Sequence, residues 1–138
     1  MNLKMWLAGI ALASAFILSA CGGGSSSAGT TVEMLDTFKF NPESITVASG
    51  SQVVIKNTGA LQHNWVLVNS ADASDVAAAA LANGGSAEGL PGVLAGGKLL
   101  NGGQEETITI SVPAGTYQYI CTVAGHYQAG MVGNITVQ

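Results

Sequence analysis

The chain has 138 residues, of which 48% are hydrophobic and only 9% are charged, and its formal net charge is −4 at pH 7. That length is enough for one domain once a targeting segment is set aside. Nucleic-acid binding draws on clustered Lys and Arg, and the chain has only four such residues in total, so we expect no nucleic-acid partner.

Residues 1–20 have the pattern of an export signal. Lys4 supplies a minimal positive start, and residues 5–20 form an apolar run that, at about sixteen residues, is short for a membrane span. Residues 18–21, Leu-Ser-Ala-Cys, resemble the lipobox of bacterial lipoprotein precursors. The resemblance implies cleavage before Cys21 and lipid on that residue, and two or more acyl chains anchor a protein stably. An uncleaved short membrane helix is the alternative.

A lipidated cysteine and a flexible tether follow in residues 21–30. The Gly- and Ser-rich coil after Cys21 spans about 15–18 Å on average. Residues 31–138 then form a single domain without internal repeats, and Cys121 is its only cysteine. We expect no disulfide, because Cys21 lies at a processing site. A lone thiol in an oxidising compartment usually has a reason such as a bound metal.

The domain is mostly β-prone, with short apolar runs separated by turn residues. The expected strands are Thr31–Leu35, Ser44–Ala48, Gln52–Lys56, His63–Val68, Thr107–Val112, Thr116–Cys121 and Gly133–Val137. The segment His63–Val68 shows little alternation, which indicates a strand buried on both faces. Seven or so short strands predict an all-β sandwich or barrel.

Two segments depart from the β pattern. The alanine-rich segment Ala71–Ala82 predicts a short helix, with Ser70 as its N-cap and Gly84 at its end. The Gly-rich residues 84–104 predict a loop that contains one weak strand near Lys98–Leu100.

Four side chains supply a set of metal ligands. Cys121, His126 and Met131 fall within eleven residues as Cys-x4-His-x4-Met. His63 lies far upstream in an expected strand. An ion that changes between Cu(I) and Cu(II) needs ligands suited to both states. Two imidazoles and one thiolate with a weak axial thioether form the blue-copper arrangement.

Residues 115–131, Gly-Thr-Tyr-Gln-Tyr-Ile-Cys-Thr-Val-Ala-Gly-His-Tyr-Gln-Ala-Gly-Met, resemble the copper loop of the cupredoxins. Together with residues 62–68, Gln-His-Asn-Trp-Val-Leu-Val, they are most similar to the azurin-like auracyanins of filamentous anoxygenic phototrophs. The similarity covers about residues 32–138. It implies a Greek-key β-sandwich, one type 1 copper ion and the role of a one-electron carrier rather than an enzyme.

The resemblance also implies a role for each site residue. The implied ligand atoms are His63 Nδ1, Cys121 Sγ and His126 Nδ1, with Met131 Sδ at longer range. Asn64 would secure the site, its amide N–H bonding the Cys121 sulfur and its side chain reaching Thr122. The Gln62 carbonyl would approach the ion from the side opposite Met131.

Other functions stay open on the residues alone. Cys121 and His126 could form a nucleophile and its base, although Met131 and His63 would then have no role. A copper store or chaperone would favour exposed clusters of Cys or Met. Zinc could occupy the thiolate and two imidazoles as a wrong metal.

A carrier of this kind should exchange electrons through the edge of His126. The apolar residues expected around that edge are Ala60, Leu61, Ala129 and Val132. Redox partners dock briefly through small interfaces, and the resemblance implies a c-type cytochrome, a quinol-oxidising complex or a reaction centre as partner. We expect a monomer held by its lipid on the periplasmic or extracytoplasmic face of the cell membrane.

Overall fold

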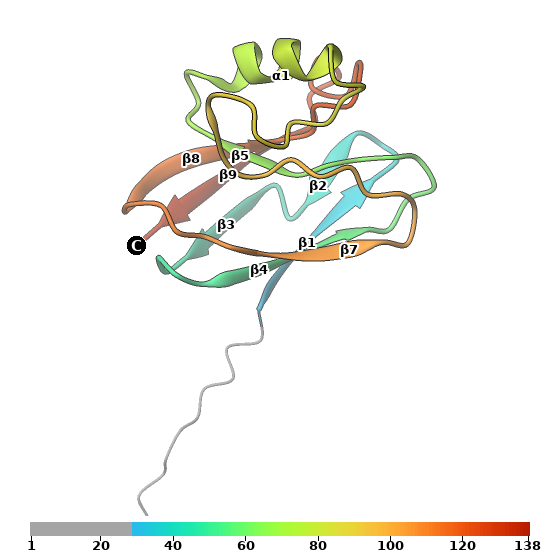
Figure 1. The fold of residues 1–138 in the computed structure, drawn as a ribbon. Coiled ribbons are helices and arrows are strands. Elements are labelled where there is room, and N and C mark those ends of the chain that lie inside the picture. Colours follow the sequence, from blue (N-terminus) through green and yellow to red (C-terminus); the bar gives the residue numbers. More distant parts are fainter. Residues whose placement is uncertain (1–28) are drawn as a thin grey trace, which may run out of the picture.

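The computed structural model describes residues 29–138, which form two β-sheets packed face to face with one helix outside them (Figure 1). In chain order the elements are β1 Thr30–Leu35, β2 Lys39–Asn41, β3 Ser44–Val47, β4 Gln52–Asn57, β5 Val66–Val68, α1 Ala73–Leu81, β6 Val93–Gly96, β7 Glu105–Thr109, β8 Gly115–Ile120 and β9 Val132–Val137. The predicted all-β sandwich with one short helix is confirmed. The predicted export signal and the lipidated Cys21 lie outside the described residues, so they stay predictions.

The two sheets do not follow the order of the chain. One has the order β2-β1-β4-β7 and the other β3-β9-β8-β5-β6. The pairs β1–β4 and β3–β9 are parallel, and the remaining strand pairs are antiparallel. Apolar side chains from both sheets fill the space between them, and Trp65 and Tyr119 are the largest that are fully buried. Their stacked rings, with centroids 5.4 Å apart, give the sandwich a rigid centre.

The strand β5 is buried on both faces, as its lack of alternation predicts. Leu67 belongs to the core between the sheets, whereas Val66 and Val68 belong to a second apolar cluster with the helix. Figure 1 shows α1 lying across the outer face of the five-stranded sheet. The helix therefore supplies the cover that lets a strand without polar positions avoid water.

Some strand bounds differ from the prediction because a pairing partner sets them. The strand predicted at Thr107–Val112 lies earlier in the chain, as β7, because β4 pairs with it only between Gln52 and Lys56. The strand β2 was not predicted. It is three residues long, too short to carry a periodic pattern, and it follows a tight turn in which Phe38 takes a φ of 58°.

The prediction of a weak strand near Lys98–Leu100 is wrong. The regular strand β6 lies earlier in the chain, and Leu100 instead forms a single antiparallel bridge with His63. Regular pairing of the strand predicted from His63 begins only at Val66. It is interrupted because the backbone N–H of Asn64 bonds a side-chain sulfur and not a neighbouring strand.

The helix α1 is shorter than the predicted Ala71–Ala82. Asp72 occupies the N-cap position in place of Ser70, and its side chain makes no capping hydrogen bond. Its backbone N–H bonds the Asn69 carbonyl, so the preceding residues are held in a turn. Past the end of the helix, Gly84 takes a φ of 62°, as expected for a glycine that ends a helix.

Segments distant in sequence meet at one end of the sandwich. Because β1 and β4 are parallel, the chain leaves the sheet at the same end after Leu35 and after Asn57. In the facing sheet β8 is antiparallel to β5, so the residue after Ile120 lies beside those before Val66. We call this the loop end, formed by residues 36–38, 58–65 and 121–131.

The tight packing of the five-stranded sheet can be tested at Gly133. This residue pairs with Tyr119 across β8 and β9, and a methyl group at this position would overlap the Tyr119 ring. The ring has no room to move, because it is fully buried and its hydroxyl donates to the Pro42 carbonyl at 2.7 Å. We expect Gly133→Ala to lower the free energy of unfolding of the metal-free protein by about 1–3 kcal/mol, measured by urea denaturation.

Gly29 provides the control for this prediction. A methyl group there would make only ordinary contacts, 3.5 Å or more from its neighbours. Gly29→Ala should therefore change the stability by less than about 0.5 kcal/mol. Equal effects of the two substitutions would contradict the proposed overlap.

Candidate metal centre

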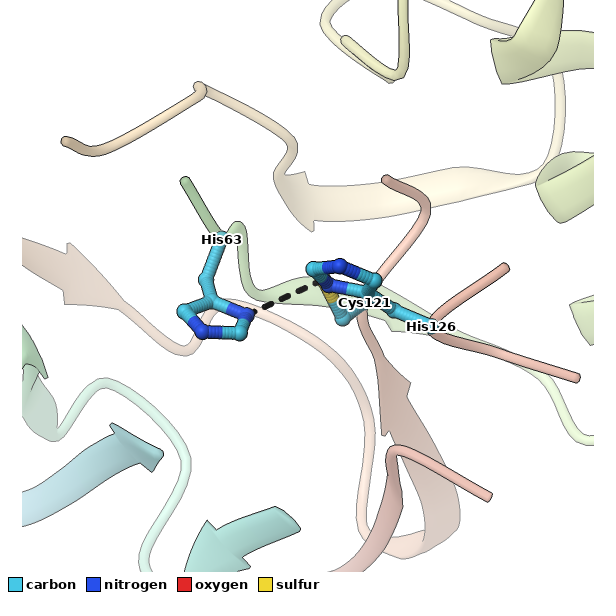
Figure 2. A group of neighbouring side chains, drawn as sticks. All are labelled: His63, Cys121 and His126. Atoms are coloured by element: carbon cyan, nitrogen blue, oxygen red, sulfur yellow. Dashed lines mark hydrogen bonds between the residues drawn. The ribbon is translucent and has the colours of Figure 1, made fainter. Parts of the chain in front are cut away.

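Three of the predicted ligand residues converge at the loop end. Cys121 directly follows β8, His126 comes from the loop after it, and His63 precedes β5. The Cys121 Sγ atom lies 3.9 Å from His63 Nδ1 and 3.4 Å from His126 Nδ1. The three donor atoms all lie within 4.8 Å of one another. Figure 2 shows the His63 ring joined by a dashed line to Cys121, with the His126 ring overlapping Cys121 in this view.

The loop that carries the other donors is held by its own backbone hydrogen bonds. The His126 N–H donates to the Val123 carbonyl at 3.0 Å, and the Met131 N–H donates to the His126 carbonyl at 3.0 Å. The Cys121 N–H donates to the Met131 carbonyl at 3.2 Å, so both ends of the loop are tied together. Gly125 and Gly130 take φ values of 85° and 90°, a conformation that glycine adopts readily.

Met131 is brought beside the donors by this loop. Its side chain is fully buried and belongs to the same apolar cluster as Cys121. Met34, in β1, is also fully buried.

Asn64 secures the start of the loop, as the resemblance implied. Its backbone N–H points to the Cys121 sulfur at 3.5 Å. Its side chain exchanges two hydrogen bonds of 2.8 Å with Thr122, and its Nδ2 also donates to the carbonyls of Gly85 and Gly97. This buried group joins four segments of the chain around the sulfur.

The Gln62 side chain points to the surface, where Nε2 donates to Asn101 Oδ1 at 3.0 Å. The approach of the Gln62 carbonyl to the ion stays a prediction.

Two residues that the sequence analysis missed also contact the donors. The His63 Nε2 atom lies 3.1 Å from Asp36 Oδ1, and the ring centroid of Phe38 lies 4.7 Å from that of His126. Both belong to the turn after β1, far upstream of the ligands. A lone Asp and a lone Phe in a turn carry no spacing pattern that would indicate a metal site, so only the tertiary structure finds them.

The environment of the donors suits a metal cation. Burial raises the pKa of the Cys121 thiol, so the thiolate needs a nearby positive charge. Burial lowers the pKa of His126, with a smaller effect from the neighbouring His63, and this favours the neutral ring that a metal requires. One thiolate and two imidazoles suit copper, and a buried Met beside them distinguishes the set from a structural zinc site.

Comparison with known proteins agrees with this chemistry. Residues 27–138 match the family described as copper binding proteins, plastocyanin/azurin family. The chain belongs to this family. The predicted resemblance to the cupredoxins is thereby confirmed, and the cofactor is one type 1 copper ion per chain.

Individual relatives support the same assignment. Auracyanin-A of Chloroflexus aurantiacus is 36% identical over 99% of this chain and 98% of its own length. The crystal structure of dithionite-reduced auracyanin from the photosynthetic bacterium Roseiflexus castenholzii has a TM-score of 0.72 and 32% identity, covering 81% of this chain and 98% of that one. The copper-resistant cuproprotein CopI of Rubrivivax gelatinosus is 32% identical over 78% of this chain and 64% of its own length.

Two further expectations concern the cysteines and the membrane. Cys121 is a free thiol, and because Cys21 lies outside the described residues the expected lack of a disulfide stays a prediction. Among residues 29–138, no helix is both long enough and apolar enough to cross a membrane.

Asn64→Ala tests the hydrogen bonds around the sulfur. The substitution leaves the buried Thr122 N–H without its acceptor and removes a packed side chain. We expect the free energy of unfolding of the metal-free protein to fall by about 2–4 kcal/mol in urea denaturation. Asn83→Ala, which changes an exposed amide after α1, is the control and should have little effect. Unchanged stability of the Asn64 variant would refute the structural role of these bonds.

Proposed function

We propose that the chain is a blue-copper one-electron carrier with the ligand atoms His63 Nδ1, Cys121 Sγ, His126 Nδ1 and, at longer range, Met131 Sδ. The convergence of two imidazole nitrogens on one buried sulfur supports this proposal above all. A bound copper ion supplies one-electron exchange between its Cu(II) and Cu(I) states. The protein supplies the ligands, their fixed positions and the exclusion of water.

The surrounding structure suits a carrier because it limits movement of the ligands. Asn64 holds the sulfur and the start of the loop, and the backbone bonds of residues 121–131 hold the remaining donors. His63 lies just before β5, is bridged to Leu100 and has none of its surface exposed. A site that changes geometry little between two oxidation states loses little energy in rearrangement at each electron transfer.

His126 is the natural point of electron exchange. Of the two imidazoles it alone retains exposure, 8% against none for His63. Ala60, Leu61 and Ala129 are exposed at the same loop end, and Leu61 is 46% exposed. Val132, which we expected in this apolar face, instead packs into the cluster beneath α1.

The environment of Cys121 argues against catalysis by a cysteine nucleophile. Reactive cysteines have a lowered pKa and are partly exposed, whereas burial raises the pKa of this thiol. A store or chaperone would need ready exchange of metal, whereas all four proposed ligands are buried. These observations favour a carrier over an enzyme or a copper store.

The proposed location is the extracytoplasmic face of the membrane, with lipid on Cys21 and the residues between it and β1 as tether. The fold supports this arrangement, because Thr30 starts β1 and the loop end follows its last residue. The tether would thus join the sandwich about 20 Å, the length of six strand residues, from the loop end. The copper face would stay free for a c-type cytochrome, a quinol-oxidising complex or a reaction centre, in respiratory or photosynthetic electron flow.

The two cysteines allow a matched test of the copper site. Protein loaded with Cu(II) should be intensely blue, with narrow copper hyperfine splitting in its electron paramagnetic resonance spectrum. Cys121→Ser should abolish the colour, because the thiolate–copper bond produces it. Cys21→Ser makes the same chemical change elsewhere and should leave the colour unchanged. A pale wild-type protein with an ordinary tetragonal spectrum would reject the blue-copper assignment.

The same pair of variants tests the anchor in the native host. Mass spectrometry of the wild-type protein should find an N-terminal acylated Cys21, and the protein should sediment with membranes. Cys21→Ser should abolish the modification and release the chain from the membrane, whereas Cys121→Ser should stay lipidated. An intact, unmodified N-terminus on the wild-type protein would exclude lipidation.

A further inference from the structure

Asp36 uses both of its carboxylate oxygens at the loop end. Oδ1 lies 3.1 Å from His63 Nε2 and accepts the Leu61 N–H at 3.1 Å, while Oδ2 accepts the Ala60 N–H at 2.7 Å. The same carboxylate therefore contacts a ligand ring and the backbone that leads to it. Its side chain is 39% exposed, on the outer side of the fully buried imidazole.

Gly59 leaves the space that this carboxylate fills. A Cβ atom at this position would overlap the carboxylate of Asp36. The Gly59 N–H is itself held by Asn57 Oδ1 at 3.0 Å, which keeps the backbone close to the turn after β1. The backbone of residues 59–61 thus holds the Asp36 carboxylate in place, so its contact with His63 is not made by a freely moving surface side chain.

A carboxylate at this distance determines which nitrogen of His63 carries the proton. A carboxylate only accepts hydrogen bonds, so in the neutral ring this contact places the N–H on Nε2. Nδ1 is then left with its lone pair, on the side of the ring that faces Cys121. A carboxylate behind a ligand imidazole orients the ring and makes it a stronger donor.

We propose that Asp36 is a positioning residue of the copper site, which fixes the orientation and tautomer of His63 and lowers the reduction potential through its negative charge. The inference rests on the proposed function. A nearby negative charge stabilises the doubly charged oxidised ion more than the singly charged reduced ion. His126 has a different neighbour, the apolar ring of Phe38. The two imidazoles therefore have different roles. The charge of Asp36 beside His63 tunes the reduction potential, and His126 exchanges electrons.

Asp36→Asn removes the negative charge while keeping the size of the side chain. Its one remaining oxygen can still accept from His63 Nε2 and the Leu61 N–H, although the hydrogen bond from the Ala60 N–H is lost. Asp75→Asn is the matched control, because it makes the same change at an exposed residue of α1, on the outer face of the other sheet (Figure 1). Asp36→Ala removes both the charge and the acceptor.

The first measurement uses the metal-free protein. Nitrogen chemical shifts of His63 should show a single tautomer with the proton on Nε2 in the wild type. Asp36→Ala should produce a mixture of tautomers, while Asp75→Asn should match the wild type. The same mixture in the wild type, or a single Nε2 tautomer in Asp36→Ala, would overturn the positioning role.

The second measurement uses the copper-loaded proteins. We expect Asp36→Asn to weaken Cu(II) binding by about 10–100-fold and to weaken Cu(I) binding less. The potential should rise, since each tenfold difference between the two affinities corresponds to about 59 mV for one electron. Asp75→Asn should leave both affinities within about twofold of the wild type, since screening weakens distant surface charges.

The outcomes distinguish this inference from the proposed function. A wild-type potential in Asp36→Asn, with only stability reduced, would show a purely structural residue and overturn the inference. A wild-type protein that binds copper without a blue colour would overturn the proposed function. The tautomer of His63 in the metal-free protein would still decide whether Asp36 positions the ring.

Discussion

The loop end depends on the buried amide side chain of Asn64. Through it the segment before β5 is bonded to Thr122, Gly85 and Gly97, while its backbone N–H points to the Cys121 sulfur. Each of these groups is away from water, so a lost bond would leave a polar atom unsatisfied. Satisfying them together sets the distance between the two strands that carry the donors. The position of the sulfur follows from that distance.

The two imidazoles share one sulfur but have different surroundings. His63 is fully buried just before β5 and contacts the carboxylate of Asp36, whereas His126 is held on a loop beside Phe38 and keeps some exposure. A charged neighbour and complete burial suit a ligand that tunes the metal. Exposure and an apolar surrounding suit a ligand that meets a partner. This division of roles would let one small site hold a fixed reduction potential and still be accessible to a partner.

The copper ligands could be predicted because their residue types and the short spacing between three of them indicate a metal site. Cys121, His126 and Met131 fall within eleven residues, and together with His63 they supply the ligand types of a blue-copper site. Asp36 could not be predicted in this way, because its contact with His63 joins residues 27 positions apart in the chain. A single acidic residue in a turn is common, and only the parallel pairing of β1 with β4 places it behind the ring.

The all-β class, the burial of β5 on both faces and the choice of donor residues could be predicted from periodicity and from the chemistry of side chains. The end of β7, the place of the short strand β2, the packing of Val132 beneath the helix and the contact of Asp36 with His63 became visible only in the folded chain. Strand bounds depend on the pairing partner, and contacts between distant segments depend on the order of strands in the sheets. A local stretch of residues therefore predicts neither the strand bounds nor the contacts between distant segments.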